Sequence, residues 1–276
     1  MKDNFTVIHE TNNISKAMNT FKYGEELVPL LTTETLHVGF DKAFNVVYFE
    51  VSVPNATPAK IAATYDNAAG LQTLKICDET NGFTKSGFIT FERPTDPVKT
   101  TIETEEKIYI HFQTDTDLDP TTKFKGVGIV FNTNEDLEAI RSNIRTTLND
   151  GESLIHKIEL AKDTIVQMLN NQGNVKIVQD NSGSLTSGTY MQSITEFDFL
   201  SITQLRLAST YLAASLFYLE ELSDDVGDKW EMQGKRHRVK FNDLFNIYLL
   251  KIDLDNDGQA STSEVSHVDT ITITLD

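Results

Sequence analysis

The chain has 276 residues, of which 39% are hydrophobic and 24% are charged, a composition typical of a folded protein whose length favours two domains over one. Its formal net charge of −17 argues against a protein that reads DNA or RNA sequence, because nucleic-acid phosphates repel an acidic surface. An acidic protein can still line a conduit through which DNA slides without sticking. No stretch approaches the roughly 18 apolar residues of a membrane-spanning helix, and we expect no signal peptide at the N-terminus.

The chain has a single cysteine, Cys77, so it cannot form an internal disulfide. Chains without disulfides are typical of reducing compartments, and we expect this protein to assemble in one. Cys77 ends the apolar run LQTLKIC, which favours a small buried hydrophobic residue over a reactive thiol.

The N-terminal half divides into two segments of different pattern. Residues 1–24 are polar and weakly periodic, which predicts an N-terminal arm that becomes ordered when it docks on a neighbour. Residues 25–132 contain seven or eight short alternating runs, such as VVYFEVSV and KIYIHFQ, separated by turn signals such as PNATP and RPTDP. Short strands without intervening helices predict an antiparallel β-sandwich.

Residues 133–276 change to a helical period. Apolar residues recur at helical spacing over 134–148 and 153–169, and two longer helices are predicted over 197–222 and 229–252. Between the helices at 153–169 and 197–222, two β-like runs flank a Gly/Ser-rich loop, which indicates a hairpin or a flexible projecting loop, and the final VDTITITLD predicts a C-terminal strand. The sequence therefore predicts an α+β fold, in which an N-terminal antiparallel β-sandwich precedes a helical domain with a C-terminal strand.

The stretch DLDNDGQASTSE at residues 253–264, here called the calcium loop, fits the EF-hand pattern at every ligand position, with Gly258 at the sharp turn. The groups that would bind the ion belong to Asp253, Asp255, Asp257, Gln259, Ser261 and Glu264. A helix is predicted before the loop, but the segment after it is strand-like and the loop occurs once, whereas sensor EF-hands pair. We expect one structural Ca²⁺ that clamps the end of the preceding helix, and the alternative is a solvated acidic turn.

The run KRHRVK at residues 235–240 is strongly basic in an acidic chain. One interpretation is a solvated helix face paired with the acidic turn SDDVGD, and the other is a basic stripe that faces an acidic partner subunit or DNA phosphates. The candidate interaction residues are Lys235, Arg236, Arg238, Lys240 and Trp230. Trp230 is expected to be a packing anchor, with ligand stacking as the alternative.

Motifs of catalytic sites do not occur in the sequence. It has no HExxH, GxSxG, P-loop GxxxxGK[ST] or Rossmann GxGxxG pattern, and no carboxylate stands in an apolar setting that would raise its pKa. We therefore expect no catalytic residues, no cofactor beyond the structural Ca²⁺ and no enzymatic activity.

Two parts of the chain resemble protein families of tailed bacteriophages. HVGFDKAF, VVYFEVSVP and LQTLKICDETNGFTKSGFITFERP, within Leu36 to Phe112, are similar to the β-sandwich module of baseplate-J-like proteins. AASLFYLEEL, GDKW, RVKFNDLFNIYLL and DLDNDG, within Asn134 to Asp257, resemble head-to-tail adaptor (connector) proteins.

The second resemblance implies a homo-oligomeric ring, usually dodecameric, docked beneath the portal protein and in contact with other neck or tail proteins. It also implies a place in the virion neck after assembly in the host cytoplasm, proximity to packaged DNA without sequence recognition, and no membrane. The hypothesis is thus a structural adaptor. One alternative is a tail or baseplate component, and another, of a different class, is a calcium-dependent carbohydrate-binding module, which would need exposed aromatic platforms.

Overall fold

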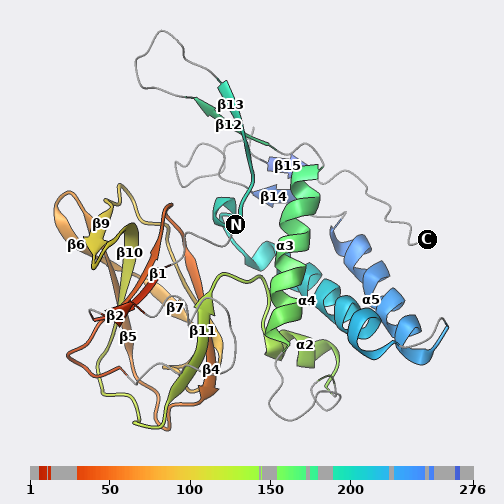
Figure 1. Cartoon of the computed structure of the whole chain (residues 1–276), viewed down its shortest axis with the longest axis horizontal. Coiled ribbons are helices and arrows are strands. Elements are labelled where there is room, and N and C mark those ends of the chain that lie inside the picture. Colours follow the sequence, from red (N-terminus) through yellow and green to blue (C-terminus); the bar gives the residue numbers. More distant parts are fainter. Residues whose placement is uncertain are drawn as a thin grey trace. The chain divides into compact units, whose positions relative to one another are not determined.

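The computed structural model describes residues 6–10, 12–13, 30–142, 144, 154–171, 175–179, 189–223, 227–245, 249–251 and 265–267. The chain forms two compact units, Met1–Ile129 and Val130–Asp276. The described elements of the first unit are antiparallel strands, and those of the second are mainly helices, as Figure 1 shows. The α+β class predicted from the sequence is therefore confirmed.

The first unit contains two antiparallel sheets. In the larger sheet the strand order is β2-β1-β3-β10-β5-β6, with β9 paired to β10, and in the smaller it is β11-β4-β8-β7. The strands are β1 (Thr6–His9), β2 (Asn12–Asn13), β3 (Leu36–Phe40), β4 (Val46–Val53), β5 (Ile61–Asn67), β6 (Gly70–Leu74), β7 (Ile76–Asp78), β8 (Gly87–Phe91), β9 (Thr100–Ile102), β10 (Glu105–Thr114) and β11 (Lys123–Gly128).

Phenylalanine side chains join the two sheets. Phe49 on β4 meets Phe112 on β10 edge to face with ring centroids 5.6 Å apart, and Phe83 and Phe124 pack beside Phe49. These rings are fully buried. Each aromatic pair of this geometry contributes about 0.5–1.5 kcal/mol beyond its buried area, so the aromatic layer holds the sandwich together.

Three sequence-based expectations for this unit are wrong. Within the predicted arm at 1–24, Thr6–His9 form β1, which pairs with β3 and buries Val7 and Ile8 completely. Cys77 is exposed, because it lies on β7, the last strand of the smaller sheet. The run LQTLKIC divides at Lys75 into β6 and β7, and these strands belong to different sheets.

The second unit begins with a short helix, α2 (Asn134–Ile140). The sequence predicts a helix over 134–148, but the backbone turns extended at Arg141 (φ −153°, ψ 91°). The other elements of the unit are α3 (Ile155–Asn171), β12 (Val175–Gln179), β13 (Thr189–Ser193), the 3₁₀ turn η2 (Glu196–Asp198), α4 (Thr203–Phe217), the π-helical turn η3 (Tyr218–Leu222), α5 (Lys229–Phe245), β14 (Leu249–Lys251) and β15 (Val265–His267).

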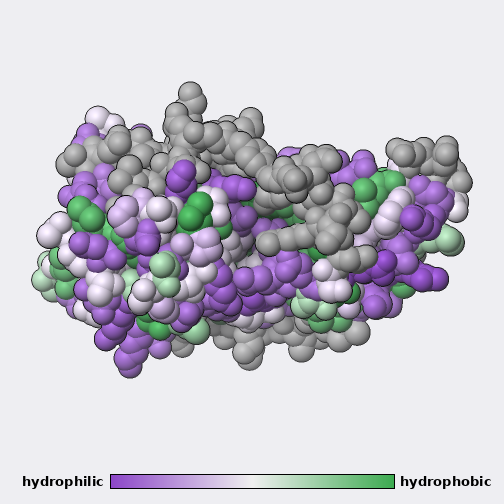
Figure 2. Space-filling model, turned by 90° about the horizontal axis from the view of Figure 1, so that it is seen from below, coloured by the Kyte–Doolittle hydropathy of each residue, from purple (hydrophilic) through white to green (hydrophobic). Residues whose placement is uncertain are grey.

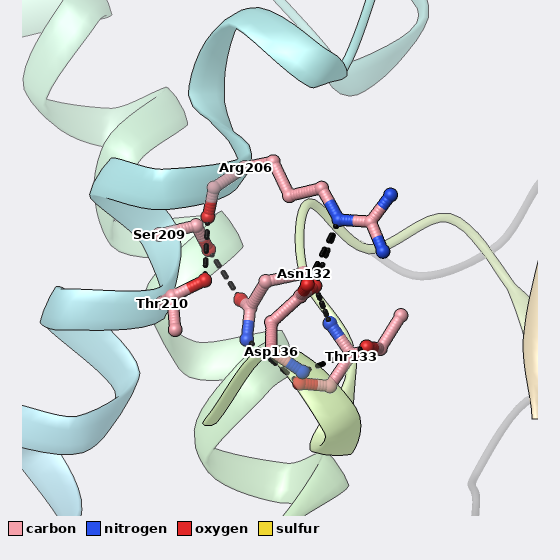
Figure 3. Close-up of polar contacts among 6 residues, drawn as sticks. All are labelled: Asn132, Thr133, Asp136, Arg206, Ser209 and Thr210. Atoms are coloured by element: carbon pink, nitrogen blue, oxygen red, sulfur yellow. Dashed lines mark hydrogen bonds and ion pairs between the residues drawn. The ribbon is translucent and has the colours of Figure 1, made fainter. Parts of the chain in front are cut away.

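A buried polar network fixes the start of α2 against α4 (Figure 3). Thr133 and Asp136 form a capping box, in which each side chain accepts a hydrogen bond from the other's backbone N–H at 3.1 and 2.8 Å. Nε of Arg206 on α4 donates to the Asp136 carboxylate, and the hydroxyl of Ser209 donates to Oδ1 of Asn132 at 2.6 Å. Both groups of the last pair are fully buried, so each depends on the other for its hydrogen bond.

Helix α3, with the residue just before it, carries the predicted apolar stripe, and all members of the stripe are buried. They are Leu154, Ile158, Ala161, Ile165 and Leu169. Lys157 on the same helix reaches η3, where its Nζ lies 2.7 Å from Glu220 and 2.8 Å from Glu221. Burial acts to lower the pKa of Lys157, but its hydrogen bonds to the two carboxylates outweigh burial and raise that pKa. After α3, the two predicted β-like runs form β12 and β13, which pair antiparallel as a hairpin, one of the two alternatives that the sequence left open.

The end of the second long helix differs from the prediction. The sequence predicts a helix up to residue 252, but α5 ends at Phe245 and the chain then forms β14. Strand β14 pairs antiparallel with β15, with Lys251 opposite Val265. The calcium loop therefore connects two paired strands and does not follow a helix. The predicted C-terminal strand over 268–276 lies outside the described residues.

Candidate functional site

Helices α4 and α5 form an antiparallel hairpin that carries all the interaction residues predicted from the sequence (Figure 1). The turn η3 continues α4 by one wider, π-helical turn, a feature that is frequent at functional sites. Gly234 lets α5 approach this turn, because a Cβ at that position would lie 2.5 Å from Cγ of Leu219. Because the two helices lie this close, aromatic side chains from one can stack on those from the other.

Four rings from the two helices stack in one row, here called the aromatic column. Trp230 and Tyr218 lie 5.8 Å apart and nearly parallel, Tyr218 and His237 lie 5.5 Å apart, and His237 and Tyr211 lie 5.8 Å apart. The two rings from each helix are seven residues apart in sequence, which places them on one face two turns apart. The rings therefore alternate between the helices and fix how the helices pack.

Cations surround the aromatic column. Nζ of Lys229 lies 4.3 Å from the centre of the Trp230 ring, and Nζ of Lys240 lies 5.0 Å from that of Tyr211. The guanidinium of Arg141 lies 6.0 Å from the Tyr218 ring, at the limit of a cation–π contact. Such contacts contribute about 0.5–1 kcal/mol each at exposed sites.

The imidazole of His237 lies inside the column, although its neighbours in sequence are charged. It is 7% exposed, and neither ring nitrogen has a hydrogen-bond partner within the described ranges. Burial, assisted by the nearby cations of Lys240 and Arg141, lowers the pKa of His237 to about 4. Burial also raises the pKa of Tyr218, which Arg141 partly offsets. Both rings are therefore neutral at pH 7.

The exposed surface of α5, here called the outer face, mixes apolar with basic residues, and Lys240 lies at its edge, beside the aromatic column. It consists of Met232, Lys235, Arg236, Val239 and Lys240. Met232 and Val239 are 52% and 58% exposed. Lys235 forms an ion pair with Glu231 at 2.7 Å, and this hydrogen bond lowers the pKa of Glu231. Arg236 has no ion-pair or hydrogen-bond partner among the residues that the structure describes.

Among the described residues, large apolar side chains are also exposed at Leu31, Leu71 and Val98 in the first unit. On the side of the molecule seen in Figure 2, most of the described surface is hydrophilic, and hydrophobic residues form small separate groups. Leu207, 45% exposed, adds a third large apolar side chain on the α4–α5 hairpin. Met232 and Val239 are seven residues apart on α5, which places them on the same face of the helix, two turns apart. Exposed apolar residues that share a face with polar neighbours are typical of protein–protein contact sites.

The structure divides the basic run in a way that the sequence pattern does not indicate. Lys235, Arg236 and Lys240 lie on the outer face, whereas the guanidinium of Arg238 is half-buried, 5.8 Å from the Phe241 ring, and burial lowers its pKa. Trp230 is half-buried in the column, as a packing residue would be. The sequence analysis did not predict that Tyr211, Tyr218 and His237 stack on one another. The signal was the seven-residue spacing of Tyr211 from Tyr218 and of Trp230 from His237.

The predicted metal site cannot be described in the same way. The six ligand residues of the calcium loop lie outside the described residues, and only the strands β14 and β15 on either side of it are placed. Over the residues that are described, no group of three or more His, Cys, Asp or Glu side chains is arranged to hold a metal ion.

Comparisons with known proteins give no family for this chain. No protein-family model matches the sequence. A search of curated proteins finds no significant match. Within its described ranges, none of the helices combines the length and apolar character required to cross a membrane.

Proposed function

We propose that this chain is a structural subunit of a tailed-phage virion, a head-to-tail adaptor that links the portal protein to the tail and lines the DNA conduit. The observation that carries the proposal is the outer face of α5. It presents two large apolar side chains and three basic ones on a helix whose position the aromatic column fixes. The resemblance of the helical region to adaptor proteins supplies the assembly to which such a surface would belong.

Charge supports a role in assembly over a role in nucleic-acid recognition. The chain has 24 basic and 41 acidic residues, so most of its surface repels DNA. The outer face is a local exception, and it suits an acidic protein surface, such as that of a second acidic subunit. In the proposed ring, the outer face contacts protein and the acidic remainder keeps packaged DNA from adhering.

A second position in the same particle is favoured by the first unit. Its two packed antiparallel sheets agree with the sandwich of baseplate-J-like proteins, which the sequence resembles, and would suit a tail or baseplate component. A carbohydrate-binding module has less support, because the chain's single tryptophan is half-buried in the aromatic column and offers no open platform for a sugar.

The test compares two variants with equal changes in charge and apolarity. Arg236→Glu with Val239→Glu alters the outer face, whereas Lys60→Glu with Leu71→Glu alters exposed residues of the sandwich. Light scattering after size exclusion and negative-stain images are recorded for each protein alone and with portal proteins of tailed phages. The outer-face variant is expected to weaken assembly by about tenfold or more, since hot-spot residues contribute more than about 1 kcal/mol each.

The sandwich variant is expected to assemble like the unmodified chain. Absence of any ring and of any portal affinity in the unmodified chain would refute the adaptor proposal. Labelling of Trp230 or of the sandwich in intact particles would show whether the chain lies at the neck or at the tail tip. Equal effects of the two variants would refute the role of the outer face.

A further inference from the structure

Two histidines face each other on neighbouring strands of the larger sheet. His37 on β3 and His111 on β10 are direct register partners, and their Nδ1 atoms are 2.6 Å apart. Nε2 of His111 lies 3.0 Å from Oδ2 of Asp66 on β5, and the hydroxyl of Thr100 on β9 donates to the same oxygen at 2.9 Å. The four side chains form one hydrogen-bonded row across four strands.

Only one proton fits between the two Nδ1 atoms. The Asp66 carboxylate accepts hydrogen bonds, so Nε2 of His111 must carry its proton. In the neutral pair, Nδ1 of His111 then accepts the proton that Nδ1 of His37 donates. If both rings become cations, both Nδ1 atoms carry hydrogen, and the hydrogen bond is replaced by repulsion between two charges.

The surroundings of the pair disfavour a second positive charge. The Tyr109 ring stacks against His111 with centroids 6.3 Å apart and meets His37 edge-on at the same distance. Burial first, and the neighbouring His111 second, lower the pKa of His37 to about 4, with a further small contribution from His9. Asp66 acts in the opposite direction and is outweighed.

The charged groups on the adjacent elements are already paired. Nε2 of His9 on β1 lies 3.0 Å from Glu34, and Nζ of Lys107 on β10 lies 2.8 Å from Asp41. Among the described residues, Asp66 is the one carboxylate that raises the pKa of His37. A second proton on the pair would therefore have no additional counter-charge.

We propose that His37 and His111 form an acid-sensitive latch between β3 and β10, which one shared proton closes and protonation of both rings opens. This property is independent of the proposed role in the virion. Strand β3 also pairs with β1, so opening the latch loosens the β1–β3 side of the sheet. Because the pKa of His37 is lower in the folded chain than the ordinary 6.5, stability is full above about pH 6.5 and is lost as the pH falls toward 4.

One test compares His37→Asn with His156→Asn in the full chain. Asn keeps an amide near the position of Nδ1 but does not titrate, and His156 is an exposed histidine on α3. The folding equilibrium constant is measured by urea titration at pH 7.5 and pH 5. Between pH 7.5 and pH 5, the folding equilibrium constant of the unmodified chain and of His156→Asn is expected to fall about tenfold more than that of His37→Asn. The pKa difference alone would give a fall of roughly thirtyfold, and the partial exposure of His37 reduces it.

A second test needs no variant. In protein with ¹⁵N-labelled histidine, a scalar coupling between the two Nδ1 nuclei is expected at pH 7.5 and should disappear on acidification, together with faster amide exchange in β1 and β3. The proposal is overturned if no coupling is seen, or if His37→Asn and the unmodified chain respond equally to pH. It is also overturned if Zn²⁺ stabilises the unmodified chain but not His37→Asn at pH 7.5, because the pair would then be a metal site.

Discussion

Replacing His237 with phenylalanine should stabilise the helical unit. The imidazole is 7% exposed, and its two nitrogens have no hydrogen-bond partner in the part of the chain that the structure describes. A buried polar group without a partner costs about 1–3 kcal/mol, whereas an apolar ring of similar shape does not incur this cost. Stacking on Tyr211 and Tyr218, with centroids at 5.8 and 5.5 Å, is retained in His237→Phe.

The expected gain in the free energy of unfolding is about 1–3 kcal/mol at pH 7.5. The gain should increase under acid conditions, because burial lowers the pKa of His237 to about 4 from the ordinary 6.5. A group with a lowered pKa binds its proton more readily in the unfolded chain, so the unmodified protein loses stability as the pH falls from about 6.5 to 4. At pH 5 this adds about 2 kcal/mol to the difference between the two proteins.

Urea titrations at pH 7.5 and pH 5 measure both quantities, with His156→Phe on α3 as an exposed control that should change stability by less than about 0.5 kcal/mol. Stabilisation by His237→Phe that grows toward pH 5 is the expected result. A loss of more than about 1 kcal/mol at pH 7.5 would refute the reasoning, since it would mean that the imidazole nitrogens form hydrogen bonds essential to the fold.

Three further changes test other parts of the structure. Gly39→Ala should cost about 1–3 kcal/mol in thermal or urea unfolding, because a Cβ there would lie 2.4 Å from Cε1 of the buried Tyr109 ring, and an unchanged midpoint would contradict this packing. Ser209→Ala should also cost about 1–3 kcal/mol, because Oδ1 of buried Asn132 loses its 2.6 Å donor. If the calcium loop binds its ion, Ca²⁺ at 100 times its dissociation constant should stabilise the chain by about 2.7 kcal/mol. Chelator or Glu264→Gln should remove that effect in calorimetric titrations, and an unmodified chain indifferent to Ca²⁺ would favour the solvated acidic turn.

Much of the strand pattern could be predicted from local sequence, because the alternation of apolar residues reports which side of a strand is buried. Ile110 and Phe112 are fully buried, as their period of two predicts, but Tyr109 and His111 between them are buried as well, so the pattern identifies the strand and not an exposed side. The division of LQTLKIC between two sheets could not be predicted, because it depends on pairing partners distant in sequence. The same limit applies to the latch, whose histidines are 74 residues apart and meet only through strand register.

The predicted end of α5 is wrong, although apolar residues keep their helical spacing beyond it. Phe241, Phe245, Tyr248 and Ile252 continue a helical stripe, but the helix ends at Phe245. The following residues are aromatic and branched, so they suit a strand equally well, and β15 provides the pairing that decides between the two. Similarly, counting charges in KRHRVK predicts one basic surface, whereas the helical period places His237 in the column and Arg236 outside it.

One side of α5 packs in the aromatic column and the outer face remains exposed, so salt should act on the proposed assembly through the outer face. Residues on one side lock the helix through ring stacking, so the outer face is already in place and loses little conformational entropy on binding. Contacts made by Arg236 and Lys240 weaken as salt shortens the range of charge interactions, while contacts made by Met232 and Val239 do not. Salt also reduces the repulsion between two chains that each carry a net charge of −17. Assembly that strengthens with salt would therefore indicate that the apolar pair dominates the outer face, and assembly that weakens would indicate that its basic residues do.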